Sequence, residues 1–264
     1  MISDYFSEQS STLSEASNSL PKDKQQEVAA IYTFLKSLDA SVSNHKRKEF
    51  FAFAQHWQDS WNGEVVDDAV TETFMELSYK YQFERKWIES YFASKKFDLE
   101  KKQCTTIADT IWYMYGSAEV IGLMFCRIAN LPEEAEKYAA LMGRAVQFVN
   151  FLRNWKLHVK QGKHYIPALP ADPKTKKERE RFTEETRKQL KKFYSWLHEA
   201  KKGFPLIPYK LRVSVMTMAD SYSWIAKQIE RDPLRVFQER IRVPRHLMRF
   251  YTVKNKVQAL FIKE

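Results

Sequence analysis

The sequence predicts an all-α protein that folds as one domain. Apolar residues recur every three or four positions along most of the 264-residue chain, which is the period of an amphipathic helix. Only 6 glycines and 9 prolines are present, too few to punctuate the many short strands of a β-sandwich or propeller. No repeat of fixed period and no linker-like segment divides the chain, and its length suffices to bury a substantial core.

Helical spacing is clearest near the start of the chain, in residues 22–43. Pro21 lies at the first turn of this predicted helix, where its missing N–H costs no hydrogen bond. The apolar stripe of the helix consists of Val28, Ile31, Tyr32, Leu35 and Leu38. The same spacing predicts further helices at 46–61, 66–80, 84–95 and 105–130.

The second half of the chain continues the pattern. Helices are predicted at 132–160, 175–201 and 209–230. Pro132 begins the first of them, and Asp232-Pro233 stops the last. The middle one is strongly charged, so we expect it to face solvent. Residues 234–264 are basic and weakly patterned, and we interpret 245–264 as a basic tail.

The charge balance indicates which partners remain open. The chain has 43 Lys and Arg against 33 Asp and Glu, a formal net charge of +10. This is compatible with nucleic acid, an anionic membrane or a phosphorylated substrate. The charged segment 175–201 mixes both signs, which favours a solvated surface over a nucleic-acid face.

The longest apolar stretch covers residues 111–131. It contains Glu119 and Arg127, so we interpret it as a buried helix and not as a membrane span. We expect Glu119 to be either a buried acid or the partner of a nearby Lys or Arg. The two cysteines, Cys104 and Cys126, form no disulfide framework, and the start of the chain has no apolar signal core. These features predict a cytoplasmic protein.

A polar ridge stands out on the predicted helix at 132–160. Its members, at steps of three and four residues, are Gln147, Asn150, Arg153, Asn154 and His158. Side chains at this spacing share one face of a helix. The ridge is either an ordinary surface in water or the hydrogen-bonding wall of a cavity.

Several short motifs occur in a characteristic order along the chain. They are Leu20-Pro21 with Tyr32-x-Phe34, then Tyr113-Met-Tyr-Gly116-Ser-Ala118 with Gly122, then Gly143-x-Ala145-x-Gln147-x-x-Asn150-x-x-Arg153, and Gly162-x-x-Tyr165-x-Pro167. This arrangement resembles the squalene/phytoene synthase family, and its phytoene synthase branch most closely. The resemblance implies one isoprenoid-synthase-type helical bundle with a central cavity over residues 1–264. Family members join two prenyl diphosphates head to head through a cyclopropyl diphosphate.

The chain departs from the two acidic motifs of that family. The resemblance places the first motif helix at 22–44 and the second motif helix and its loop at 132–167. The first motif, DDxxD, reads here Asp39-Ala40-Ser41-Val42-Ser43. The second, RDxxED, reads Arg153-Asn154-Trp155-Lys156-Leu157-His158. Ala40, Ser43, Asn154, Leu157 and His158 therefore occupy degenerate positions, and Asp39 is the remaining acid.

Mg²⁺ is the cofactor that the resemblance implies if the protein is active. Mg²⁺ takes oxygen ligands and bridges carboxylates to substrate phosphates. With Asp39 as its one weak carboxylate ligand, we expect at most weak binding of the ion without substrate. The resemblance also assigns catalytic roles to Asp39 and Tyr165, and Asp98 matches a family position near the cavity. The substrate-binding residues that it implies are Lys36, Gln147, Asn150, Arg153 and Lys163.

Three functions remain open at this point. The first is a divergent prenyltransferase that condenses geranylgeranyl or farnesyl diphosphate in isoprenoid and carotenoid biosynthesis. The second is an inactive relative that serves as a scaffold, regulatory or assembly partner of another protein. The third is a prenyl diphosphate binder without turnover. A peripheral contact of the tail at 245–264 with an anionic membrane is expected to accompany a lipid substrate, and nucleic acid is not an expected partner.

Overall fold

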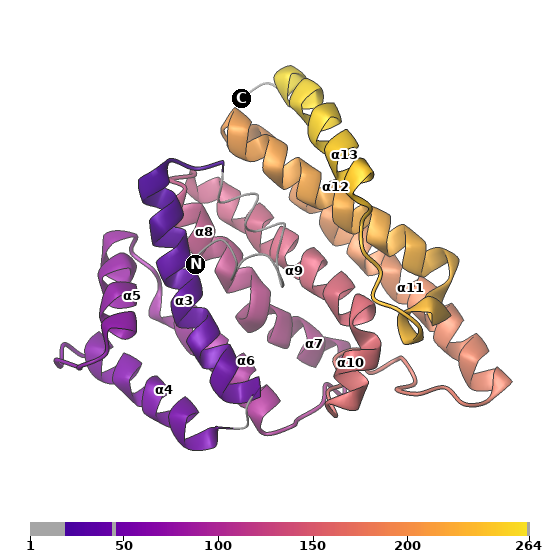
Figure 1. Ribbon diagram of the computed structural model, residues 1–264, viewed down its shortest axis with the longest axis horizontal. Coiled ribbons are helices and arrows are strands. Elements are labelled where there is room, and N and C mark those ends of the chain that lie inside the picture. Colours follow the sequence, from indigo (N-terminus) through magenta and orange to yellow (C-terminus); the bar gives the residue numbers. More distant parts are fainter. Residues whose placement is uncertain (1–18, 44–45, 263–264) are drawn as a thin grey trace.

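The computed structural model describes residues 19–43 and 46–262, and within them all regular structure is helical. The predicted all-α class is therefore confirmed. The α-helices are α3 (Lys22–Ser43), α4 (Arg47–Trp61), α5 (Ala69–Lys80), α6 (Arg85–Leu99), α7 (Ile107–Met114), α8 (Val120–Ile128), α9 (Glu136–Arg153), α10 (Trp155–Lys160), α11 (Lys176–Lys201), α12 (Tyr209–Arg231) and α13 (Arg245–Gln258). Figure 1 shows α3 to α6 on one side of the bundle and α11 to α13 on the other, with α8 and α9 between them.

Two apolar cores hold the helices together. The first joins α3 to α6 with α8, and Phe34 and Phe74 stack within it at a centroid distance of 3.8 Å. The second joins α7 and α9 to α11 and α12, with Phe148 and Phe193 fully buried. Burial of such aromatic side chains contributes roughly 2–3 kcal/mol each. The boundary between the two cores lies along α8 and α9.

Close helix packing explains the glycines of the central motifs. A Cβ atom on Gly116 would lie 2.1 Å from the backbone oxygen of Ser90 on α6, and one on Gly122 would lie 2.7 Å from that of Ala139 on α9. Only glycine permits this approach of backbones. Between α7 and α8 the chain forms a short π-helix, η1 (Tyr115–Glu119). The stretch predicted as one helix at 105–130 thus contains one wider helical turn.

Glu119, at the end of this π-helix, is buried in the interior of the bundle. Its two carboxylate oxygens accept hydrogen bonds from Nε and Nη2 of Arg144, at 2.7 and 2.9 Å. Glu119 is therefore a buried acid and also the partner of an arginine, so both of the alternatives expected for it apply. Burial raises the pKa of the Glu119 carboxyl above its ordinary value, although Arg144 opposes the shift.

The apolar stretch around η1 lies inside the bundle. Val120 and Met124 are almost completely buried. None of the helices in the described ranges is both long and apolar enough to cross a membrane. Cys104 and Cys126 are free and buried, and burial raises the pKa of both thiols to about 12.

The helix predicted at 132–160 is interrupted in the structure. A 3₁₀ turn over Glu133–Ala135 precedes α9, and α9 ends at Arg153. Asn154 leaves the helical conformation, with φ −102° and ψ 18°, and α10 begins at the next residue. The next residue explains the turn, because the Trp155 ring is buried and its Nε1 donates to the carbonyl of Ala171 at 3.0 Å. Single-sequence periodicity does not detect such a tertiary anchor.

The structure adds detail to two expectations about the second half of the chain. The charged positions of α11 are mostly exposed, as expected of a solvent-facing helix, but Phe182, Leu190 and Phe193 on another of its faces are fully buried. The supposed basic tail is the helix α13, which packs on α12. Arg212 of α12 fixes the end of this helix by donating from Nη1 to the carbonyl of Ala259 at 3.1 Å. These contacts lie far apart in sequence, which is why the local pattern was weak.

Candidate functional site

Two adjoining cavities lie where the two cores meet. The larger has a volume of about 490 Å³ and is enclosed by α3, α6, α8, α9 and α12. The smaller has a volume of about 380 Å³ and lies between α3, α6, α7 and the loop after α10. Residues that line both are Lys36, Asp39, Lys95, Gln147, Phe151 and His158. We call the region around these shared residues the polar mouth.

Away from the polar mouth, the larger cavity is apolar. This part is lined by Ile121, Phe125, Met142, Val146, Phe204, Ile207, Leu211, Val215 and Met218. Gly122 and Gly143 add backbone without side chains to the same wall. The lining suits a hydrocarbon chain, since apolar surface is transferred out of water on binding.

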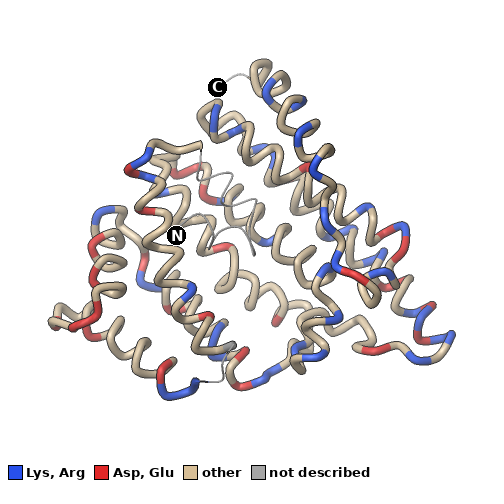
Figure 2. The backbone as a smooth tube through the Cα atoms, viewed as in Figure 1, with Lys and Arg blue, Asp and Glu red and all other residues tan. Residues whose placement is uncertain are grey.

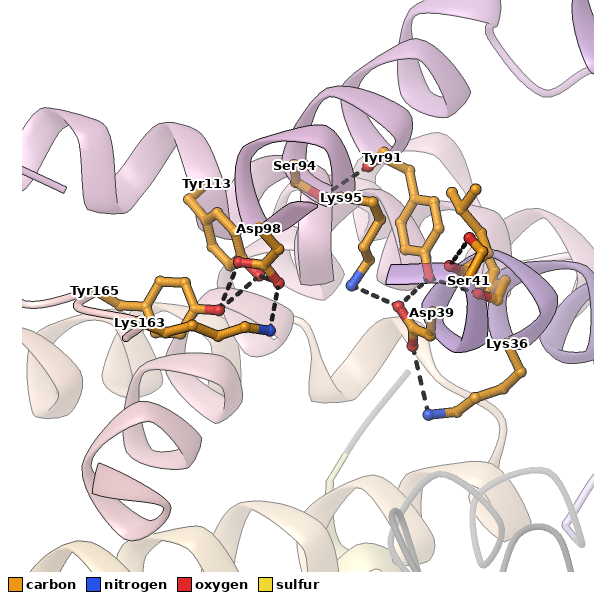
Figure 3. Close-up of polar contacts among 12 residues, drawn as sticks. Lys36, Asp39, Ser41, Tyr91, Ser94, Lys95, Asp98, Tyr113, Lys163 and Tyr165 are labelled. Atoms are coloured by element: carbon orange, nitrogen blue, oxygen red, sulfur yellow. Dashed lines mark hydrogen bonds and ion pairs between the residues drawn. The ribbon is translucent and has the colours of Figure 1, made fainter. Parts of the chain in front are cut away.

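Asp39 lies at the polar mouth between two lysines (Figure 3). Lys95 Nζ is 2.8 Å from Oδ1 of Asp39, and Lys36 Nζ is 3.4 Å from Oδ2. The Tyr91 hydroxyl donates to Oδ1 at 3.2 Å. Burial alone would raise the pKa of the Asp39 carboxyl, but the charges of Lys95 and Lys36 outweigh it and lower the pKa. Burial lowers the pKa of Lys95, but the carboxylates of Asp39 and Asp98 raise it above its ordinary value.

Asp98 is the centre of a second cluster, beside the first in Figure 3. Its Oδ1 accepts from the Tyr165 hydroxyl at 2.7 Å, and its Oδ2 accepts from the Tyr113 hydroxyl at 2.9 Å. Lys163 Nζ lies 3.1 Å from the same Oδ2. Burial, followed by neighbouring groups that include Asp98, raises the pKa of both tyrosines well above the ordinary value, so they act as neutral donors. Tyr165 therefore serves Asp98 and presents no phenolate to the cavity.

The polar ridge of α9 lines the cavity wall. Gln147, Asn150, Arg153, Asn154 and His158 all border the larger cavity. The Asn150 Oδ1 accepts from Arg153 Nη2 at 2.7 Å and from the Tyr222 hydroxyl at 3.2 Å. Asn150 thereby holds the guanidinium of Arg153 over the Tyr222 ring, 5.5 Å from its centroid. Of the two interpretations of the ridge, the cavity wall agrees with this geometry.

The degenerate motif positions supply few charges to the site. Asn154, Leu157 and His158 border the larger cavity and Ala40 borders the smaller one. The side chain of Ser43, at the end of α3, is outside the described part. Burial lowers the pKa of His158 to about 4, and the nearby charge of Lys163 adds to the shift. His158 is therefore a neutral imidazole near pH 7.

The donor set does not fit a divalent metal. In the described ranges, no group of three or more His, Cys, Asp or Glu side chains lies close enough to hold an ion. The one motif carboxylate, Asp39, already faces two ammonium groups, and the facing helix offers Leu157 and Asn154 instead of acids. Mg²⁺ would need several oxygen ligands at this point. We therefore derive no step through Mg²⁺ for this chain.

Sequence reasoning missed two cationic residues and underrated one acid. Lys95 and Arg240 border the cavity but escaped notice, and Asp98 seemed a weak signal. One signal was available, because Tyr91, Lys95 and Asp98 stand four and three residues apart and so share a helix face. Arg240 lies beyond α12 in a segment without helical pattern, so nothing local indicated its position.

Comparisons with known proteins agree with this architecture. The model of the squalene/phytoene synthase family matches residues 6–247. A phytoene synthase of Arthrospira platensis is 24% identical over 255 residues, covering 85% of this chain and 81% of that protein. A 4,4′-diapophytoene synthase of Staphylococcus haemolyticus is 24% identical over 165 residues, covering 60% of this chain and 58% of that protein.

Solved structures show the same fold. A dehydrosqualene synthase in complex with a ligand superposes with a TM-score of 0.81 at 19% identity, covering 97% of this chain and 94% of that one. A squalene synthase of Alicyclobacillus acidocaldarius gives a TM-score of 0.74 at 15% identity, covering 87% and 92%. The predicted single-domain isoprenoid-synthase-type bundle is thus confirmed.

Proposed function

Since the chain belongs to the squalene/phytoene synthase family, we propose that it binds a prenyl diphosphate of farnesyl or geranylgeranyl length in the two adjoining cavities. One observation carries the proposal. The lining changes from apolar side chains on α8, α9 and α12 to cationic side chains at the polar mouth. A ligand with a long hydrocarbon tail and an anionic head matches both ends, whereas a wholly polar or wholly apolar ligand would match one.

In this proposal the ridge of α9 recognises the head group. Arg153 is already oriented by Asn150 and can present two parallel N–H donors to phosphate oxygens. Gln147 and Lys36 border the same space and add an amide and an ammonium group. Lys163 is tied to Asp98 at the far side of the smaller cavity. These residues bind and orient the diphosphate.

We propose further that the chain holds this ligand and does not condense two copies of it efficiently. Metal ions stabilise the departing diphosphate when carboxylates supply their ligands. Here the motif side chains that the structure describes do not offer such a ligand set. Head-to-head condensation, the reaction that the family suggests, and a purely protein-binding scaffold are the two alternatives.

One titration with one product assay separates the three functions. Purified protein is titrated calorimetrically with farnesyl and geranylgeranyl diphosphate, and parallel samples with Mg²⁺ are extracted and analysed for condensed hydrocarbon or cyclopropyl diphosphate. We expect binding without product. Rapid formation of product would favour the condensing enzyme, and absence of binding to either ligand would favour the scaffold.

We propose in addition that α13 contacts an anionic membrane. Five apolar side chains on α13 and the following turn are more than half exposed, and they are Phe250, Val253, Val257, Leu260 and Phe261. Residues 245–261 include four Lys and Arg and no Asp or Glu, and Figure 2 shows basic residues along this helix. An apolar stripe flanked by cations has the chemistry that anionic lipid head groups bind.

Vesicle sedimentation tests the membrane contact. We expect salt-sensitive binding to vesicles that contain phosphatidylglycerol, and binding about tenfold weaker for the double variant Phe250→Gln, Phe261→Gln. Val65→Gln, at an exposed valine far from α13 in the sequence, is the matched control. Deleting the segment after Pro244 is a poorer test, because Arg212 and Asp220 of α12 would lose their partners on α13. Equal binding of wild type and double variant, or association of the protein with itself through this stripe, would contradict the proposal.

A further inference from the structure

We infer that ammonium and guanidinium groups bind the diphosphate directly, in the place where the family's acidic motifs would hold metal ions. This inference rests on the proposed function and deepens it. It makes the site a metal-independent receptor for a lipid diphosphate. The change of recognition chemistry explains why the motif acids are replaced without loss of the cavity.

The first observation is the position of the lysines. Lys95 Nζ lies 2.8 Å and Lys36 Nζ 3.4 Å from the oxygens of Asp39, the acid that remains from the first motif. Two positive charges therefore stand beside this carboxylate. An ammonium group can donate hydrogen bonds to phosphate directly. Unlike a metal ion, it does not need carboxylates to hold it in place.

The second observation is an excess of positive charge. The charged residues that line the two cavities, within the described ranges, are Lys36, Lys95, Arg153, Lys163 and Arg240 against Asp39 and Asp98. Both acids are already engaged with lysines. Clefts of low polarity with one sign of charge concentrate ligands of the opposite sign. A multiply charged anion at the polar mouth would balance this excess.

The third observation concerns the arginines at the mouth. The Nε atom of Arg153 is buried and has no hydrogen-bond partner among the residues that the structure describes. Arg240 also borders the cavity, and burial together with the charges of Arg153 and Arg242 lowers its pKa. A buried donor without a partner is rare, because it loses hydration without compensation. A phosphate oxygen at this point would accept from Arg153 and relieve the repulsion between the guanidinium groups.

Calorimetric titration with farnesyl diphosphate, in excess EDTA and in millimolar Mg²⁺, tests the inference. We expect dissociation constants that agree within about threefold in the two buffers. We expect Asp39→Asn to tighten binding in EDTA several-fold, because it removes an anion that competes with the diphosphate for the two lysines. Were Asp39 a metal ligand, the same change would instead weaken binding in the Mg²⁺ buffer. Asp67→Asn, at an exposed acid outside both cavities, is the matched control.

Removing a cationic side chain should change the affinity for farnesyl diphosphate in the opposite direction. Lys95→Met and Arg240→Gln should each weaken binding in EDTA about tenfold, and Lys227→Gln, at an exposed lysine of α12, should not change it. Only 12% of the Lys95 side chain is exposed, so a melting curve checks that its variant folds, and Arg240→Gln keeps the test valid if it does not. Binding that requires Mg²⁺ would overturn the inference and leave the proposed function intact. Absence of binding in both buffers would overturn the proposed function itself.

Discussion

The two sides of the polar mouth differ in how they treat negative charge. On the side of α3 and α6, Asp39 and Asp98 remain, and each faces at least one lysine within hydrogen-bonding range. On the side of α9 and α10, the motif positions carry Asn154, Leu157 and a neutral His158. Asp39 and Asp98 are already paired with lysines of the protein, and the facing motif positions add no acid.

This difference shows that a site whose motif acids are replaced can still contain charged groups. A pair of acidic motifs would repel a diphosphate unless cations stood between them. In this chain the cations belong to the protein itself. The described lining of the two cavities thus combines an apolar wall with a mouth that carries more cationic than anionic side chains. Four changes of residue or solution can break or sharpen the comparison between the two sides.

The largest effect is expected from Asp98→Ala. The change leaves the buried hydroxyls of Tyr113 and Tyr165, and the amine of Lys163, without their acceptor. Removing one member of a buried charged network typically costs about 3–5 kcal/mol in the free energy of unfolding. Urea denaturation measures this loss. Asp67→Ala, at an exposed site, should change the same quantity by less than about 0.5 kcal/mol, and an equally small effect at Asp98 would refute the network.

The second effect is a pH dependence that distinguishes the two sides. His158 has a pKa of about 4 in the folded protein and an ordinary value of 6.5 in the unfolded chain. Between these values the unfolded chain binds the proton first, so the free energy of unfolding falls as the pH falls from 6.5 to 4. The full loss amounts to at most about 3 kcal/mol, at 1.36 kcal/mol per pKa unit. Asp39 acts lower, because its pKa is depressed below 3.8 and its contribution is lost only as the pH falls through that depressed value.

Difference measurements isolate the histidine from other titrating groups. Urea denaturation of wild type and His158→Gln across this pH range should show a steeper loss of stability for wild type. His56→Gln, on α4 and away from the cavities, is the control and should follow wild type. Parallel curves for wild type and His158→Gln would mean that His158 takes up its proton without strain in the folded state.

The third effect comes from restoring acids to both sides. We expect the combined variant Ala40→Asp, Ser43→Asp, Asn154→Asp, Leu157→Glu and His158→Asp to gain Mg²⁺ binding, because several oxygens must act on each ion at once. Millimolar Mg²⁺ should then raise the melting temperature by a few degrees, equivalent to about 1–2 kcal/mol, and leave that of wild type unchanged. The matched control carries the corresponding amides, Asn or Gln, at the same positions. Single restorations should do little, and a clear Mg²⁺ response of the EDTA-treated wild type would contradict our account of the donor set.

The fold was accessible from sequence because local periodicity reports which helix face is buried. Helix α3 begins and ends where its apolar stripe predicts. The break at Asn154 and the helix α13 were not predicted, since each depends on partners distant in sequence, Ala171 for Trp155 and Arg212 for the end of α13. Such partners leave no periodic trace.

The site was accessible only in part, for a related reason. The ridge around Asn150 and Arg153 was visible because its members share one helix face. Lys95 looked like one surface lysine among many in its segment, and what distinguishes it is Asp39, which arrives from another helix. Motif comparison reports which acids have been replaced. It does not report which cationic residues from other parts of the chain lie next to those positions in the folded protein.

The smallest effect, and the most direct comparison of the two sides, is the difference in stability between variants that lose one hydroxyl on either side. Tyr165→Phe removes a donor from Asp98. Tyr91→Phe removes a donor that Asp39, at 3.2 Å, shares with the Leu35 carbonyl, at 2.9 Å. Asp98 is 8% exposed and receives two of its three contacts from hydroxyls, whereas Asp39 has two lysines and more contact with solvent. We expect Tyr165→Phe to cost about 1.5–2 kcal/mol and Tyr91→Phe about 1 kcal/mol in urea denaturation. Both changes keep the ring, and the loss at Tyr91 includes the bond to Leu35, so it is an upper limit on what Asp39 gains from its hydroxyl donor. A loss at Tyr165 no larger than that at Tyr91 would contradict the greater dependence of Asp98 on neutral donors.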